Sequence, residues 1–365
     1  MKELDELAVA ISEIFAEGMV NKGPMHIFHK ECATGYIQSY NVRGLLAHYQ
    51  HYKNEKWFTA AKLWTEFSIR MQGTHGHPAA YNMGYGAEYM TKDGVPLSWF
   101  VADTTDQATA ILNMAWLLPA SDPLYLKILE SILKFDDYIQ QWNLGEKGFA
   151  LGYMGGENYN KESYHCAVAR CISYYSAMYL VFNKEIYKQR GITLLKQMLE
   201  NDNFNSNFHG APSTNRCYAS YALLDAYYIL AENDDKLRKI ILDKVKNEII
   251  PWAIKNITED GFWPHDRFGD QPGAPKTVDK SKMGVYTWGV LLGLEMFSKL
   301  LEPIDSLENT ISKSYEYMKK TLEPGDINRW GHHSWATTAV ATKLYPQHFF
   351  PMGARYRNSI KNGEK

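Results

Sequence analysis

The residues best suited to acid–base chemistry lie in two short segments. Asp103 and Asp106 are three positions apart, so on a helix they share one face. Two carboxyl groups held that close raise the pKa of one of them, as a general acid requires. Glu162 and His165 repeat the same spacing. Asp103 is equally suited to capping a helix N-terminus, and Glu162 to a solvated rim, so both kinds of interpretation stay open.

A third segment contains Asn215, Arg216 and Tyr218. An arginine in an otherwise uncharged helix needs an anionic partner, because burial of an unpaired charge is costly. The carboxylate of an acidic substrate suits the planar guanidinium fork of Arg216. An ion pair with one of the acids named above is the alternative.

Two further segments mix aromatic rings with polar groups, and this mixture fits a sugar-binding subsite. The substrate-binding residues predicted there are His265, Asp266, Tyr286, Trp288, Trp330, His332, His333 and Trp335. Adjacent histidines point in different directions on a helix, so His332 and His333 make a poor metal site. The sequence contains neither an HExxH motif nor a Gly-rich phosphate loop, and we therefore expect no catalytic metal and no cofactor.

The predicted helices that carry these segments are of two kinds. Helices rich in Ala, Gly, Ser, Cys and aromatics, typical of burial on most sides, are expected at Thr34–Tyr52, Thr104–Leu118, Ser163–Phe182, Thr214–Ala231, Met283–Leu300 and Ser334–Tyr345. Amphipathic helices with one charged side are expected at Lys2–Met19, Glu55–Met71, Pro123–Trp142, Lys184–Glu200, Asp235–Ile257 and Asp305–Leu322. The two kinds alternate strictly, which predicts an inner and an outer ring of six helices each. No clear strand pattern is present.

The loops alternate in length as well. Short turns at 54, 183 and 233–234 join inner helices to outer ones. Long loops lead from outer helices to inner ones, at Gln72–Ala102, Asn143–Glu162, Asn201–Ser213, Thr258–Lys282 and Glu323–His333. The long loops are therefore expected at one end of the rings, over the N-termini of the inner helices. Structured loops on one face of a rigid scaffold usually carry function.

Composition limits the classes of function. Apolar residues make up 45% of the 365 residues and no linker interrupts them, so one domain, 1–365, is expected. The formal net charge of -2, with both signs interspersed, argues against nucleic acid and membrane surfaces as partners. The N-terminus lacks the pattern of a signal peptide, so a cytoplasmic location is expected. The 14% aromatic content, with 10 Trp and 25 Tyr, fits stacking against sugar rings.

With this alternation the chain resembles the six-hairpin glycosidase superfamily, which includes unsaturated glucuronyl and rhamnogalacturonyl hydrolases. Toroidal polysaccharide lyases and N-acylglucosamine 2-epimerases are similar in architecture. The resemblance covers nearly the whole chain and implies an all-α fold, an (α/α)6 toroid of six helical hairpins. It also implies an active-site aspartate at the start of the second inner helix, where Asp103 stands. A proton-donating aspartate is implied near Glu162, where this chain has glutamate.

The expected function is that of a glycoside hydrolase acting on an acidic, uronic-acid-containing oligosaccharide, with Arg216 binding the uronate. Asp103 and Glu162 are predicted to face one another across the mouth of a central cavity, roughly 8–10 Å apart. A polysaccharide lyase is one alternative, with the groups for β-elimination supplied by Asn215, Arg216, Tyr218, His165 and His332. A sugar epimerase and a non-catalytic glycan-binding protein are the others.

Overall fold

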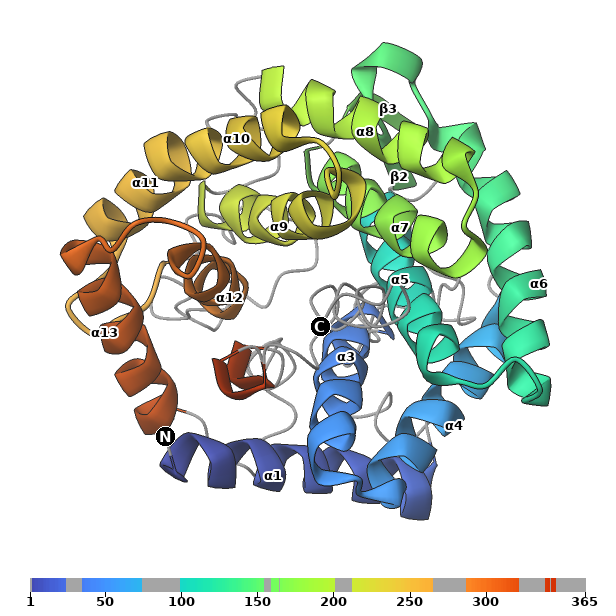
Figure 1. The fold of residues 1–365 in the computed structure, drawn as a ribbon. Coiled ribbons are helices and arrows are strands. Elements are labelled where there is room, and N and C mark those ends of the chain that lie inside the picture. Colours follow the sequence, from blue (N-terminus) through green and yellow to red (C-terminus); the bar gives the residue numbers. More distant parts are fainter. Residues whose placement is uncertain are drawn as a thin grey trace.

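The computed structural model describes residues 2–23, 35–73, 99–153, 159–163, 165–200, 212–264, 287–321, 339–341 and 343–345. These residues form two concentric rings of helices (Figure 1). The outer ring consists of α1 (Lys2–Glu17), α4 (Glu55–Met71), α6 (Pro123–Ile139), α8 (Glu185–Glu200), α10 (Asp235–Lys244) with α11 (Ile250–Asn256), and α13 (Asp305–Thr321). The inner ring consists of α3 (Gly35–Tyr52), α5 (Val101–Leu117), α7 (His165–Phe182), α9 (Pro212–Asp225), α12 (Thr287–Ser298) and helical residues around 339–344. The predicted all-α (α/α)6 toroid is confirmed.

Short stretches of other helical geometry extend several of these helices. The π-helical turns are η1 (Gly18–Lys22) after α1, η6 (Ala226–Leu230) after α9 and η7 (Val245–Ile249) between α10 and α11. The 3-10 turns are η4 (Gln140–Trp142) and η5 (Gly145–Lys147). With η7 included, α10 and α11 act as one long outer helix, which matches the predicted range Asp235–Ile257.

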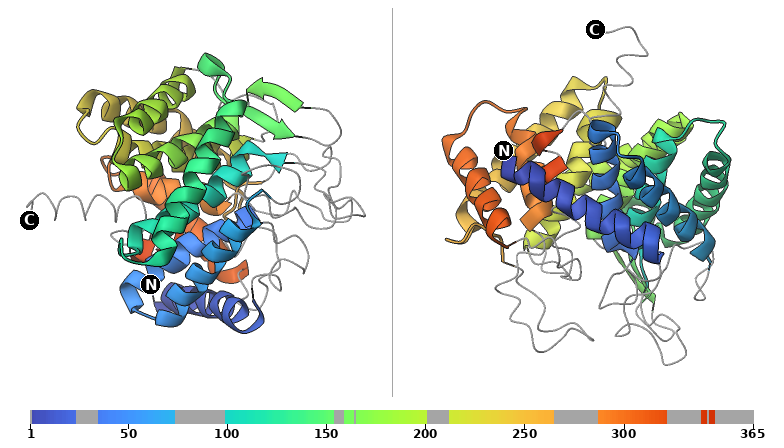
Figure 2. Two further views of the ribbon diagram at one scale, coloured as in Figure 1. Left: turned by 90° about the vertical axis from the view of Figure 1, so that its right-hand side faces the viewer. Right: turned by 90° about the horizontal axis from the view of Figure 1, so that it is seen from below.

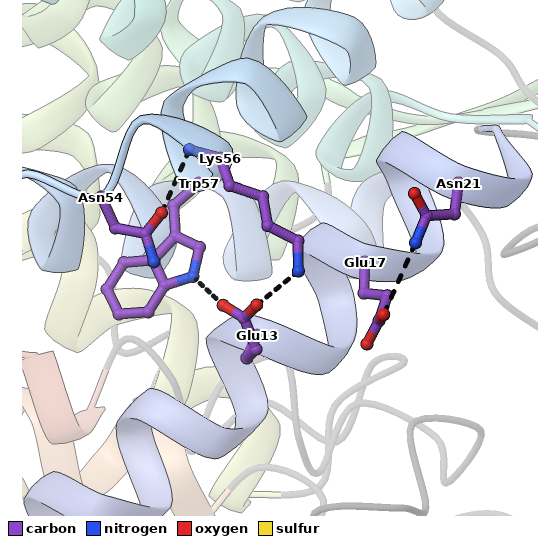
Figure 3. Close-up of polar contacts among 6 residues, drawn as sticks. All are labelled: Glu13, Glu17, Asn21, Asn54, Lys56 and Trp57. Atoms are coloured by element: carbon purple, nitrogen blue, oxygen red, sulfur yellow. Dashed lines mark hydrogen bonds and ion pairs between the residues drawn. The ribbon is translucent and has the colours of Figure 1, made fainter.

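Outer helices α4 and α6 begin at side-chain caps. Asn54 accepts a hydrogen bond from Lys56 N at 3.1 Å, and Asp122 accepts one from Leu124 N at 2.9 Å. Figure 3 shows how α4 is then fixed to α1: the Glu13 carboxylate pairs with Lys56 and accepts from Trp57 Nε1 at 2.7 Å. The Trp57 ring is buried while its N–H is satisfied, which is the usual requirement for an interior tryptophan.

The ring closes where the beginning of the chain meets its last described hairpin. Figure 1 shows α1 beside α13. The Asp5 carboxylate accepts hydrogen bonds from the hydroxyl groups of Tyr52 and Tyr345, the latter 340 positions away. The Tyr345 ring also stacks on His51, with 3.9 Å between centroids. These contacts hold the first and last hairpins together.

A small sheet lies at one end of the rings (Figure 2). Its strands are β1 (Trp99–Phe100), β2 (Ala150–Tyr153) and β3 (Tyr159–Ser163), antiparallel in the order β1-β2-β3. The sequence predicted no strand, because segments of two to five residues are too short for an alternating pattern to stand out. β1 leads directly into α5, and β3 ends two residues before α7 begins. The sheet therefore ties together the starts of two neighbouring inner helices.

Inner helices α9 and α12 approach each other through two glycines. A Cβ on Gly289 would lie 2.1 Å from Cys217 Sγ, and one on Gly293 would lie 2.3 Å from Ser220 Cβ. The two glycines are four residues apart, so they form one face of α12. Close contact between these helices thus depends on the missing side chains.

Gly293→Ala is expected to lower the free energy of unfolding. Overpacking costs about 1–3 kcal/mol, which exceeds the roughly 1 kcal/mol that alanine gains over glycine in a helix. Gly191→Ala on α8 is the matched control, because its Cβ would come within 3.0 Å only of Cδ1 at the end of the flexible Leu230 side chain, at 2.7 Å, and would lie 3.4 Å from Tyr175 Cβ. Urea denaturation of both variants measures the difference. Equal stability of the two variants would contradict the close α9–α12 contact.

Candidate functional site

Asp103 lies in the first turn of α5, at the end of the rings where the sheet is. Phe100 occupies the N-cap position of this helix, so Asp103 is its third residue and not its cap. Of residues 101–115, all of them described, Asp103 alone is not buried. Partial burial of the carboxyl group and the negative charge of Asp106 raise the pKa of Asp103 well above its ordinary value, against the opposing effect of Arg170. Asp103 is thus a partly accessible carboxyl group that binds its proton more tightly than an ordinary aspartate.

Asp106, one turn further along α5, is buried and paired. Its Oδ2 lies 2.9 Å from Arg170 Nε and accepts a hydrogen bond from the Tyr40 hydroxyl group at 2.5 Å. Arg170 Nη2 in turn donates to the Tyr40 oxygen. Helices α3, α5 and α7 are therefore joined by a closed triangle of polar contacts.

The Arg170 guanidinium is enclosed by aromatic rings. Its Cζ lies 4.1 Å from the ring centroid of Tyr218, 4.9 Å from that of Tyr221 and 5.3 Å from that of Tyr40. Desolvated cation–π contacts of this kind are worth up to about 2 kcal/mol each. Tyr218, a predicted substrate-binding residue, therefore supports Arg170 from α9, and a contact with substrate stays a prediction.

A second pair of opposite charges, Arg43 and Asp225, interacts electrostatically further along the inner helices. Burial raises the pKa of the Asp225 carboxyl group to about 6, opposed by the positive charge of Arg43, by Ser173 and by Arg170. Arg43 Nε lies 3.1 Å from the Asn113 side-chain oxygen in the amide orientation that satisfies both neighbours of Asn113. We call Arg43, Asp106, Arg170 and Asp225 the charge quartet. Its signs alternate from α3 through α5 and α7 to α9, and each member is at most 4% exposed.

Asp225 should make the stability of the folded protein depend on pH. Its folded-state pKa of about 6 exceeds the ordinary value of 3.8, so the folded state binds the proton more tightly than the unfolded state. Stability is therefore lost as the pH rises through this interval, by about 3 kcal/mol at 1.4 kcal/mol per tenfold change in affinity. Urea denaturation across this interval measures the effect, and Asp225→Asn should remove it. A wild-type protein and variant with parallel pH profiles would contradict the assignment.

Arg216 on inner helix α9 packs against outer helix α11. The Arg216 guanidinium Cζ is 4.5 Å from the ring centroid of Trp252 on outer helix α11. Burial, together with the charges of Arg216 and Lys244 on outer helix α10, lowers the pKa of His165 to about 4. His165 is therefore neutral near pH 7. A catalytic role for His165 and a substrate contact for Arg216 stay predictions.

The predicted helix boundary implied that Glu162 stands at the start of a helix. In the structure Glu162 lies on β3 instead. β1 and β3 are the two edges of the sheet, since Phe100 pairs with Gly152 and Ala150 pairs with Ser163. Two interstrand spacings amount to about 9–10 Å. The backbone of Glu162 is therefore about that far from the strand that leads into Asp103, while the Glu162 side chain lies outside the described residues.

Most predicted aromatic subsites fall outside the described part of the chain. This applies to His265, Asp266, Tyr286, Trp330, His332, His333 and Trp335, and to the side chain of Trp288. Among the residues that the structure describes, no group of three or more His, Cys, Asp or Glu is placed to hold a metal ion. None of the helices in the described ranges is long and apolar enough to span a membrane.

The sequence analysis did not single out Tyr40, Arg43 or Asp225. A signal was present, because Arg43 and Arg170 are, like Arg216, charged residues on predicted inner helices. Each of them requires a buried anionic partner by the same physical reasoning. Which partner each arginine meets depends on how far neighbouring helices are shifted along their axes. Composition does not reveal this shift for helices that are far apart in sequence.

The sequence matches no family model and no curated protein. Solved structures of similar fold include cellobiose 2-epimerase from Bacillus thermoamylovorans B4167, with TM-score 0.61, 13% identity, and coverage of 81% of this chain and 79% of that one. An unsaturated glucuronyl hydrolase specific for heparin gives TM-score 0.57 and 10% identity, covering 96% and 98%. A family 105 glycoside hydrolase from C. acetobutylicum ATCC 824 has a TM-score of 0.57 and 13% sequence identity, and the match covers 92% of this chain and 99% of that one. A polysaccharide lyase also matches.

These similar structures share the (α/α)6 toroid fold with this chain. They are carbohydrate-active proteins of several kinds: hydrolases, a lyase and an epimerase. At this low identity the likeness extends to the fold, and a choice among the activities has to come from the residues.

Proposed function

We propose that this chain is a glycoside hydrolase in which Asp103 is the general acid. The observation that carries the proposal is the combination of partial exposure and a raised pKa at Asp103, on an inner helix whose neighbouring residues are all buried. A general acid must keep its proton near neutral pH and must still reach the leaving oxygen. Asp106 carries the opposite role of a fixed carboxylate, because Arg170 and Tyr40 hold it.

Glu162 is the proposed second carboxyl group. Glycosidases that invert configuration separate their two carboxyl groups by about 6.5–9.5 Å to admit a water molecule. The spacing of about 9–10 Å between the edge strands of the sheet supports this separation. Glu162 would then activate the water from the side of the sugar opposite Asp103.

The proposed substrate is an acidic, uronic-acid-containing oligosaccharide. Support comes from the fold shared with an unsaturated glucuronyl hydrolase specific for heparin and with a family 105 glycoside hydrolase. The position of Arg216 against Trp252 gives no support to the uronate contact expected of it.

One set of assays tests the activity. Unsaturated uronyl disaccharides absorb in the near ultraviolet, and hydrolysis of the unsaturated sugar removes this absorbance. Loss of absorbance with release of a new reducing end is the expected result. A gain of absorbance on an intact polyuronate would instead identify a lyase, and an isomerised sugar detected by NMR would identify an epimerase. Binding without any product across an acidic glycan panel would contradict catalysis altogether.

A further inference from the structure

Two carboxyl groups stand one helical turn apart on α5, and their surroundings differ. Three residues of α-helix rise about 4.5 Å, so Asp106 lies that far along the axis from Asp103. The charged groups that act electrostatically on Asp103 are Asp106 on its own helix and Arg170 on α7. Asp106 is affected by the charges of Arg170 and of Arg43 on α3, and by the hydrogen bond from Tyr40, also on α3. Both acids feel the charge of Arg170, but within the described part of the chain Asp106 also has the Tyr40 hydrogen bond and the charge of Arg43.

These contacts separate the roles of the two acids. Burial raises the pKa of Asp106, while Arg170, the Tyr40 hydroxyl group and Arg43 lower it. Burial lowers the pKa of Arg170, but Asp106 and Tyr40 together with other neighbours raise it by more, so Arg170 stays a cation. One carboxyl group of a close pair resists ionisation when the other is already charged. The pair thus favours a state in which Asp106 carries the charge and Asp103 carries the proton.

We propose that Asp106, Arg170 and Tyr40 are positioning residues that fix one negative charge a helical turn from Asp103 and so keep the Asp103 proton available for transfer. Tyr40 orients the carboxylate, because its hydroxyl group contacts both Asp106 and Arg170. Arg170 is held in turn by the rings of Tyr218 and Tyr221. Only the use of the proton in catalysis rests on the proposed function. The charge arrangement itself is a property of the free protein.

The test is a titration of Asp103 in the free protein. Infrared difference spectra between the wild-type protein and Asp103→Asn isolate the protonated-carboxyl stretch of Asp103. In the Asp106→Asn background, the same comparison should show Asp103 losing its proton at lower pH, because the nearby negative charge is gone. Tyr40→Phe keeps the ring, and it should shift the titration in the same direction through weaker fixation of the Asp106 charge.

The outcomes are distinguishable from failure of the proposed function. If Asp103 titrates at the wild-type pH in both folded variants, the positioning role is overturned. If Asp106→Asn does not fold, Tyr40→Phe alone decides. If the titration moves as expected but no glycoside is cleaved, the proposed function fails and the positioning role stands. Where cleavage is found, the alkaline limb of its pH profile should move to lower pH with the titration, a change that a purely structural role would not produce.

Discussion

Asp103→Asn is expected to reduce the turnover number on a hydrolysed glycoside by about 10²–10⁴-fold, the usual contribution of a general acid. The substitution preserves shape and hydrogen-bonding capacity but removes the transferable proton. Because the raised pKa favours the neutral form of Asp103 in the folded protein, asparagine resembles that form and should cost little stability. The Michaelis constant should change much less than the turnover number, since the proton moves in the transition state.

The leaving group separates acid catalysis from other roles of Asp103. A glycoside with an activated aryl leaving group needs little protonation, so the loss in Asp103→Asn should shrink on such a substrate. Asp137→Asn, the same substitution at an exposed position on outer helix α6, is the matched control and should keep full turnover. Wild-type turnover in Asp103→Asn together with a lower melting temperature would show that Asp103 is structural.

The two-ring fold could be predicted because burial divides the helices by composition. α6 carries charges along one side, whereas residues 104–115 of α5 are all buried. That difference is visible in sequence, as are the caps Asn54 and Asp122. The position of Asp103 at the start of an inner helix followed from the same alternation, with an error of three residues in where α5 begins.

The pairing within the site could not be predicted, because it depends on helix rotation and height. Arg170 and Arg216 are both arginines near the starts of inner helices, yet one meets Asp106 and the other meets Trp252. Each residue along a helix turns the side-chain direction by about 100°, so a shift of one or two residues can turn a side chain from inward to outward. Helix boundaries are uncertain by that many residues. The sheet that links β1 to β3 was missed because its strands are so short.

Arg170→Met is expected to give the largest loss of stability, about 3–5 kcal/mol in the free energy of unfolding. The substitution leaves the Asp106 carboxylate, 2% exposed, without its cation. It also removes the guanidinium from between the rings of Tyr218 and Tyr221. Asp106 can relieve part of this loss by taking up a proton. The destabilisation measured by urea denaturation should therefore grow as the pH rises, because the folded variant then binds a proton that its unfolded state releases.

A double variant and a more exposed ion pair serve as controls for this prediction. Arg170→Met with Asp106→Asn removes the uncompensated charge, so it should be more stable than Arg170→Met alone even though it carries one more substitution. Arg190→Met breaks an ion pair of similar length, 2.8 Å to Asp136, whose arginine is 32% exposed. Water can replace part of that contact, and the loss should be smaller. Equal losses at Arg170 and Arg190, with no recovery in the double variant, would mean that the buried charge is not what stabilises the inner ring. If the double variant is more stable than Arg170→Met, the loss of stability in the single variant comes from the unpaired Asp106 carboxylate. This is the same group that we propose keeps the Asp103 proton in place.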